Sequence, residues 1–174
     1  PKYICAMQIM KYIGVFMLFI AAGFYGMILL APTELEYQVN EDINAPISEV
    51  YDAISSPATM TKWMKGLESV KQTKGAEADL GSEYDLYYPQ EMVMHRVVNV
   101  YEAPFRIANE GLVKDFFSRI DDYTLEALDS NTTRVSWRVK MTSLDMKSRM
   151  IMKAEDSHKA NTAANLTSLK KLLE

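Results

Sequence analysis

The chain has 174 residues, of which 48% are hydrophobic and 24% are charged, and its formal net charge is −4 at pH 7. Two of its 19 cations, Lys2 and Lys11, precede or open a long apolar segment, and all 23 acidic residues follow it, so the remainder carries a formal charge of −6. This acidic balance argues against nucleic-acid binding, in which a basic face supplies most of the affinity, and against electrostatic attachment to anionic lipid.

The apolar segment, YIGVFMLFIAAGFYGMILLA, covers residues 12–31 without a charge. As a helix it would be roughly 30 Å long, which matches the hydrocarbon core of a bilayer. A core helix of a soluble domain would show a polar stripe, and none is present. A cleaved signal peptide remains the alternative, because Lys11 followed by an apolar run also begins an export signal. The run is long for a signal and lacks a convincing small-x-small site before TELE, so we expect an uncleaved anchor within residues 1–32.

The cations around this segment predict its orientation. Lys2 and Lys11 come before the expected span, whereas the next cation after it is Lys62. Cations close to a span favour the cytoplasmic side, so we expect a single-pass protein with a cytoplasmic N-terminus and an extracytoplasmic domain, periplasmic or extracellular. The lone Cys5 leaves the rest of the chain without cysteine, so disulfides are excluded and the redox compartment cannot be deduced.

Residues 33–174 have the length of one domain, and its opening predicts a strand followed by two short helices. In LEYQVNEDIN, apolar and polar residues alternate, as in a strand with one covered face. After Ala45 and Pro46, apolar residues recur at helical spacing in residues 47–54. SPATMTKWMKG repeats this pattern and ends at Gly66, so a second short helix is expected there.

Six further runs are strand-like, and turn residues separate them. They are LESVKQTK, SEYDLYYP, MVMHRVVNVYE, FRIANEG, FFSRIDDYTLEAL and TTRVSWRVKMT. In the last run, Val135, Trp137, Val139 and Met141 are predicted on the covered face, and Arg134, Ser136, Arg138 and Lys140 on the wet face. LDSNTT before it is typical of a hairpin turn. We therefore expect an antiparallel sheet with one face covered.

The last segment, Met146 to Leu173, contains no Gly or Pro and predicts one long helix over the sheet. Its inward face is predicted to hold apolar Met146, Met150, Ile151, Ala154, Leu169 and Leu172, together with Ser157, His158, Asn161, Asn165 and Ser168. Two interpretations stay open for the polar middle of this face. The small side chains allow close packing on the sheet, or the helix roofs a cavity whose polar groups orient a mostly apolar ligand.

This order of elements resembles the helix-grip, START-like fold of the SRPBCC superfamily, which includes polyketide cyclases, aromatases and lipid-transfer relatives. The resemblance covers nearly all of residues 35–173. It is carried by DINAPISEVYDAISSPATMTKWM, LGSEYDL, VVNVYEAPFRI and TTRVSWRV. It implies an α+β fold in which the sheet wraps the C-terminal helix, with a hydrophobic ligand between them. Fold alone does not imply a reaction.

Motifs for catalysis, metals and cofactors are absent from the sequence. We find no Cys-x-x-Cys, no His-Glu-x-x-His, no phosphate-binding glycine loop and no nucleophile elbow, so no cofactor, metal ligand or catalytic residue is assigned. The only histidines, His95 and His158, are too few for a typical histidine-rich metal site. The sequons at Asn131 and Asn165 matter only in a glycosylating secretory pathway.

Eight residues are candidates for the walls of a cavity: Glu41, Trp63, Tyr84, Tyr87, His95, Ser157, Asn161 and Asn165. Glu41 shares the alternation of the covered face, where a carboxylate would have a partner or a raised pKa, unless the strand end turns it to water. The direction of His95 is ambiguous, and a surface or satisfied core histidine is the alternative. For Trp63 and the tyrosines, the alternative is ordinary packing.

Three hypotheses on function follow. The first is a membrane-anchored domain that captures, carries or shields a hydrophobic small molecule or lipid. The second is a cyclase-like or hydrolase-like enzyme that uses Glu41, His95 and a tyrosine as acid and base. The third is a docking subunit of a membrane complex with a vestigial cavity. The first is favoured, because an anchored pocket suits an apolar ligand; protein partners and oligomeric state are not predicted.

Overall fold

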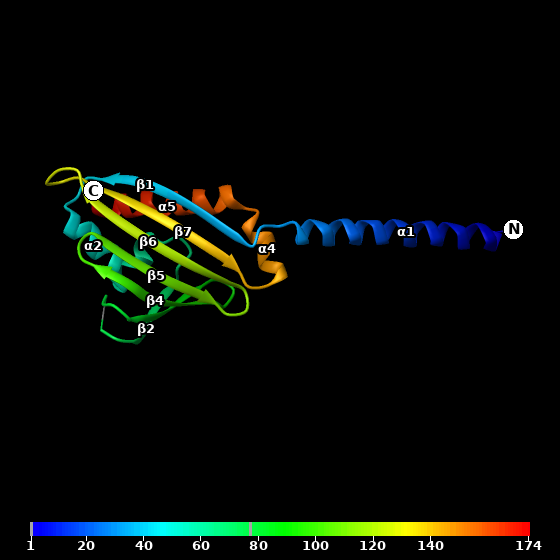
Figure 1. Cartoon of the computed structure of the whole chain (residues 1–174), viewed down its shortest axis with the longest axis horizontal. Coiled ribbons are helices and arrows are strands. Elements are labelled where there is room, and N and C mark those ends of the chain that lie inside the picture. Colours follow the sequence, from blue (N-terminus) through cyan, green and yellow to red (C-terminus); the bar gives the residue numbers. More distant parts are fainter. Residues whose placement is uncertain (1, 77) are drawn as a thin grey trace.

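The computed structural model describes residues 2–76 and 78–174, with side chains described from residue 12 onward. It consists of a long N-terminal helix and one α+β domain (Figure 1). The N-terminal helix, α1, covers Lys2–Leu29. Lys2, Lys11 and Cys5, which bear on the predicted orientation and redox state, have side chains outside the described part of the chain.

The domain contains a seven-stranded sheet in which every neighbouring pair is antiparallel, in the order β1-β7-β6-β5-β4-β3-β2. The strands are β1 Glu34–Ile43, β2 Ser69–Lys74, β3 Glu83–Tyr88, β4 Met92–Glu102, β5 Arg106–Val113, β6 Phe117–Ala127 and β7 Thr133–Ser143. All seven predicted strands are present. In β7, Val135, Trp137, Val139 and Met141 are buried and Arg138 is exposed, as the alternation predicts, while Lys140 is half-buried.

Four shorter helices follow the predicted order, with one correction. They are α2 Ile47–Ser55, α3 Pro57–Trp63, α4 Met146–Met152 and α5 Glu155–Leu173. The expected single helix over 146–173 is therefore wrong, because it is broken at residues 153–154. The acidic residues Glu155 and Asp156 favour a new helix start, and a ring nitrogen of His158 binds the carbonyl of Ile151 at 3.1 Å, near the end of α4.

The break also shifts the inward face of α5. A helical wheel drawn from residue 146 assumes one continuous helix, so its angles do not apply beyond the interruption at residues 153–154. The buried residues of α5 are Thr162, Leu166 and Leu169, whereas Leu172 and Ser157, both predicted to face inward, are exposed.

The core lies between the concave face of the sheet and the helices, with α5 packed along the β1 side (Figure 1). Trp137 is fully buried at its centre, and its ring centroid lies 4.7 Å from that of Tyr123 and 6.0 Å from that of Trp63. The opposite face of the sheet carries charged side chains such as Arg106 and Asp122. One side of the sheet is thus left for a site beneath α5.

Candidate functional site: a cavity between the sheet and the C-terminal helix

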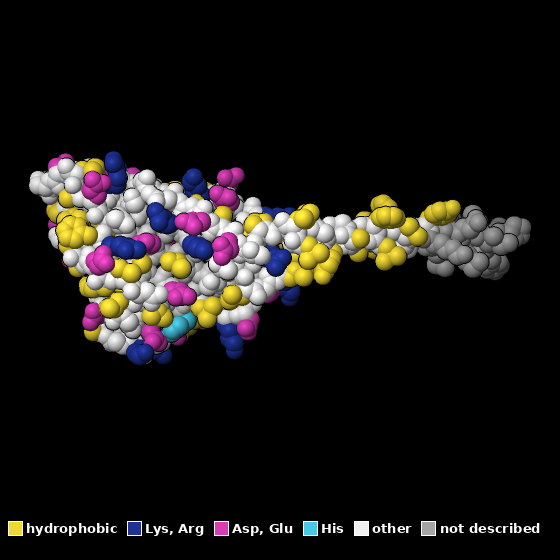
Figure 2. All heavy atoms as spheres, viewed as in Figure 1, with side chains coloured by type: hydrophobic (Ala, Val, Ile, Leu, Met, Phe, Trp, Pro, Cys, Tyr) yellow, Lys and Arg dark blue, Asp and Glu magenta, His cyan; other side chains and the backbone are white. Residues whose placement is uncertain are grey.

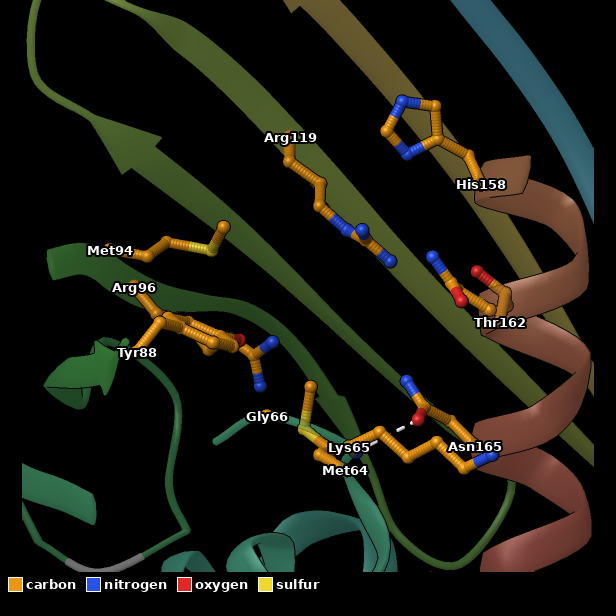
Figure 3. Close-up of a pocket in the computed structure, with 11 residues that line it drawn as sticks. Met64, Lys65, Gly66, Tyr88, Met94, Arg96, Arg119, His158, Thr162 and Asn165 are labelled. Atoms are coloured by element: carbon orange, nitrogen blue, oxygen red, sulfur yellow. Dashed lines mark hydrogen bonds between the residues drawn. The ribbon is translucent and has the colours of Figure 1, made fainter. Parts of the chain in front are cut away.

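A cavity of about 370 Å³ lies between the sheet and α5 (Figure 3). Its floor is formed by Tyr88, Met94, Arg96 and Arg119 from three strands of the sheet. Its roof is formed by His158, Asn161, Thr162 and Asn165 of α5. This volume is within the range of about 300–1,000 Å³ that small-molecule sites occupy in proteins.

The mouth of the cavity lies between α5 and the turn after α3. Met64, Lys65 and Gly66 from that turn complete the lining, and Lys65, Gly66 and Asn161 are exposed while the floor residue Arg96 is not. The backbone N–H of Lys65 donates to Oδ1 of Asn165 at 2.9 Å, which joins the turn to the helix. Gly66 has φ +78°, a conformation that favours glycine, so the turn bends sharply at the mouth.

Arg96 and Arg119 lie in one cross-strand row of the covered face. Arg96 of β4 pairs with Gly111 of β5, and Gly111 pairs with Arg119 of β6. Glycine adds no side chain between the two arginines, and a Cβ built at Gly111 would come within 2.6 Å of Met94 Sδ. The glycine therefore keeps the floor open between the two cations.

Asp121 follows Arg119 by two residues on the covered face of β6 and is its counter-ion. Its side chain is only 1% exposed, and Arg119 Nε lies 2.9 and 3.0 Å from its two carboxylate oxygens. Trp137 Nε1 donates to Oδ1 at 2.8 Å, and Arg119 stacks over the Trp137 ring at 5.6 Å from the centroid. The carboxylate is thus held by a charged fork and an indole N–H.

Arg96 is bound much more weakly than Arg119. Its side chain is 2% exposed, and its Nη2 is 3.5 Å from Oδ2 of Asp121. Its Nη1 lies 3.6 Å from the thioether sulfur of Met60, a weak acceptor, and its buried Nε has no partner among the described residues. A buried guanidinium with so few acceptors is unusual, because buried charges are normally paired and hydrogen-bonded.

The charges of the floor follow from these contacts. Burial alone would raise the pKa of Asp121, but Arg119 and Arg96 hold it below its ordinary value, so the carboxylate is ionised at neutral pH. Burial lowers the pKa of Arg119, but the ion pair with Asp121 outweighs it and the pKa lies above the ordinary value. Burial raises the pKa of Tyr88, so this phenol stays neutral.

Of the eight candidate residues, Asn161 and Asn165 line the cavity. Ser157 is exposed on α5 and does not line it. Glu41 lies on the covered side of β1, but at the far end of α5, where Lys170 Nζ lies 3.1 Å from its Oε1. His95 lies on the opposite face of the sheet, with Nδ1 2.9 Å from Asp85 Oδ1.

The three aromatic candidates also lie outside the cavity lining. Trp63 is buried in the core and donates from Nε1 to the carbonyl of Ala53 at 3.1 Å. Tyr84 is buried and accepts from the backbone N–H of Ala78 at 2.8 Å. Tyr87 points to the other face of β3, and its neighbour Tyr88 is the tyrosine that reaches the cavity.

Sequence reasoning missed the two arginines, although a signal was present. Arg96 shares the alternation of Met94 and Val98, and Arg119 shares that of Phe117 and Tyr123. A cation in phase with apolar residues marks a buried charge, by the same argument that singled out Glu41. Among residues 12–76 and 78–174, no group of three His, Cys, Asp or Glu side chains is placed to hold a metal ion.

Comparison with known proteins supports the fold. The protein XoxI of Bacillus cereus is 14% identical, with a TM-score of 0.63 over 80% of this chain and 95% of that one. A hypothetical protein of Helicobacter pylori is 12% identical, with a TM-score of 0.67 over 81% and 88%. Major latex-like protein 151 of Panax ginseng is 9% identical, with a TM-score of 0.65 over 82% and 99%. No curated protein sequence matches the chain.

A family model assigns the domain to a protein family, which these distant structures do not. The model is described as polyketide cyclase / dehydrase and lipid transport, and it matches residues 34–174, from the first residue of β1 to the end of the chain. The helix-grip fold expected from the sequence is confirmed by the seven-stranded antiparallel sheet and the C-terminal helix. This chain therefore belongs to the polyketide cyclase / dehydrase and lipid transport family.

Proposed function

We propose that the domain binds a hydrophobic small molecule or lipid in the cavity beneath α5, and that α1 anchors it beside a membrane. The observation that carries this proposal is the cavity itself, in which Met64, Met94 and the ring of Tyr88 supply apolar surface, while most of the other lining side chains are polar or charged. Small-molecule sites combine apolar surface, which supplies affinity, with polar groups, which fix the orientation of the ligand. The family description, which includes lipid transport, supports the same class of ligand.

The N-terminal helix supports the proposed anchor. Tyr12–Leu29 is long and apolar enough to cross a membrane, and Figure 2 shows apolar side chains along a helix that extends away from the domain. At its end, Lys153 Nζ donates to the carbonyl of Met27 at 3.0 Å, so the helix meets the domain beside α4. We propose that the N-terminus is cytoplasmic and the domain lies outside, on the basis of Lys2 and Lys11. A signal sequence would have the same composition.

The enzymatic hypothesis receives less support from the contacts of its candidate residues. Glu41 pairs with Lys170 near the C-terminus, whereas His95 contacts Asp85 and Glu83 on the other face of the sheet. An acid and a base must reach the same substrate to act together, and these two residues share no partner among the described contacts. Binding and carriage of a ligand require only the cavity.

The experiment that tests this function blocks the mouth of the cavity. Asn161→Trp adds a ring at the exposed edge of the lining, while the matched control Ala160→Trp adds the same ring one residue earlier, outside the lining. We expect the full-length chain in maltoside micelles to take up the neutral fluorophore N-phenyl-1-naphthylamine, with empty micelles as background. Asn161→Trp should abolish that uptake, and Ala160→Trp should preserve it.

The outcomes of this experiment are distinct. Equal uptake by both variants would contradict binding in this cavity. Both variants should keep the thermal stability of the parent, because the ring enters solvent or open space and not a packed core. Mass spectrometry of apolar material extracted from the purified chain and from Asn161→Trp gives an independent check, since only the parent chain should retain a ligand.

A further inference from the structure

The floor of the cavity carries a positive charge that the described residues do not neutralise. Arg96 and Arg119 are both cationic, whereas Asp121 is the one acidic group bonded to them. None of the described residues that line the cavity is acidic, and Lys65 adds a further cation at the mouth. This excess is notable because the domain as a whole has a formal charge of −6.

The unneutralised charge is located on Arg96. Both oxygens of Asp121 are already engaged by Arg119 at 2.9 and 3.0 Å, and Oδ1 also accepts from Trp137. Arg96 keeps only a long contact with Asp121 and a weak one with the sulfur of Met60. Its buried Nε has no hydrogen-bond partner in the described chain. A side chain that is 2% exposed cannot replace these bonds with bulk water.

We propose, building on the ligand-binding function above, that the ligand is an amphiphile whose acidic headgroup binds Arg96 and Arg119. A carboxylate or phosphate supplies the acceptors that Arg96 lacks, and guanidinium groups match the geometry of both anions. The apolar body then lies against Met64, Met94 and Tyr88. A neutral ligand leaves the cation uncompensated, so the site discriminates by charge as well as by apolar surface.

Two fluorophores that share one ring system test the charge preference. 1-Anilinonaphthalene-8-sulfonate carries an anionic group that N-phenyl-1-naphthylamine lacks. Energy transfer from the two tryptophans, Trp63 and Trp137, selects probe molecules bound next to the core and rejects those in the micelle. We expect the anionic probe to bind the full-length chain about tenfold or more tightly than the neutral one, as a charge-assisted bond with Arg96 requires.

Arg96→Met separates the charge from the shape of the floor. The variant should lose about tenfold in affinity for the anionic probe and keep its affinity for the neutral probe within about twofold. Arg138→Met, on the exposed face of β7, is the matched control and should change neither affinity. Equal affinities of the unmodified chain for both probes would overturn the proposal without any variant. Failure of both probes to bind would instead contradict the proposed function.

Competition against the anionic probe identifies the headgroup. Laurate and lauroyl lysophosphatidate should displace it, whereas dodecanol and inorganic phosphate at the same concentrations should not. Stronger displacement by laurate assigns a carboxylate, and stronger displacement by the lysophosphatidate assigns a phosphate. Displacement by dodecanol as strong as that by laurate, or by inorganic phosphate alone, would overturn the acidic amphiphile as the ligand.

Discussion

Replacing Asp121 by Asn removes the counter-ion beneath the cavity and should strongly destabilise the domain. The side chain is 1% exposed and binds Arg119, Arg96 and Trp137, so its neutral replacement leaves the buried guanidinium of Arg96 and the partly buried one of Arg119 without an anion. Removal of one partner from a buried ion pair costs about 3–5 kcal/mol. That is a large fraction of the roughly 5–15 kcal/mol that stabilises a typical domain.

This loss can be measured as a shift in melting temperature. For a domain of this size, about 3–5 kcal/mol corresponds to a decrease in Tm of about 10–20 °C. The assay is circular dichroism of the full-length chain in maltoside micelles as temperature rises. Asp122→Asn is the control, because its neighbouring carboxylate binds Arg106 on the outer face, where both side chains are partly exposed.

The control sets the scale of the expected difference. A partly exposed ion pair contributes about 0–1 kcal/mol, so Asp122→Asn should lower Tm by no more than a few degrees. If Asp121→Asn melts within about 2 °C of the parent chain, or no lower than Asp122→Asn, then the buried charges are not coupled as the structure shows.

Three further outcomes are expected. Arg96→Met should lower the unfolding free energy of the unliganded chain much less than Asp121→Asn does, because Asp121 keeps its ion pair with Arg119 and its hydrogen bond from Trp137; an equal loss in urea unfolding would contradict this. Gly111→Ala should displace Met94 into the cavity and weaken probe uptake while the fold remains, and unchanged uptake would refute the role of this glycine. The pKa of Asp121 is lowered in the folded state, so its contribution to stability is present above about pH 4 and is lost as the pH falls through the folded pKa. The unfolding free energy should therefore decrease in acid. An unfolding free energy that stays constant below about pH 4 would contradict this prediction.

The strands could be predicted because the alternation of apolar and polar residues indicates which face of each strand is covered. β7 illustrates this, since Val135, Trp137 and Val139 alternate with polar neighbours and are all buried. The same argument failed in part on β4, where Val93 and Val97 on one face and Met94 and Val98 on the other left the phase ambiguous. Arg96 was overlooked for that reason.

The site itself depends on information that a single strand does not carry. Arg96, Gly111 and Arg119 become one row only through the pairing register of three strands, which fixes neighbours far apart in sequence. The roof was predicted in part, since His158, Asn161 and Asn165 do line the cavity, but Thr162 was missed, and Leu172, predicted to face inward, is exposed. Asn161 and Asn165 still line the cavity, since each is adjacent on the helix to the buried Thr162 or Leu166.

The orientation of the chain in a membrane stays a prediction. With a cytoplasmic N-terminus, external protease should digest the domain of intact cells, or of spheroplasts where an outer membrane is present. Protection until the membrane is dissolved would contradict the prediction. The mass of the mature chain separates an anchor from a cleaved signal, because an anchor retains residues 12–31.

The most direct test of ligand binding in this cavity is methyl NMR of the full-length chain, labelled with ¹³C at its methionines, during titration with N-phenyl-1-naphthylamine. Met64 and Met94 line the cavity, whereas Met141 is buried in the core beside it. Bound aromatic rings should shift the Met64 and Met94 methyl signals saturably and by more than that of Met141, which does not line the cavity. Saturable shifts confined to other methionines, or none at all, would contradict a ligand site between the sheet and α5.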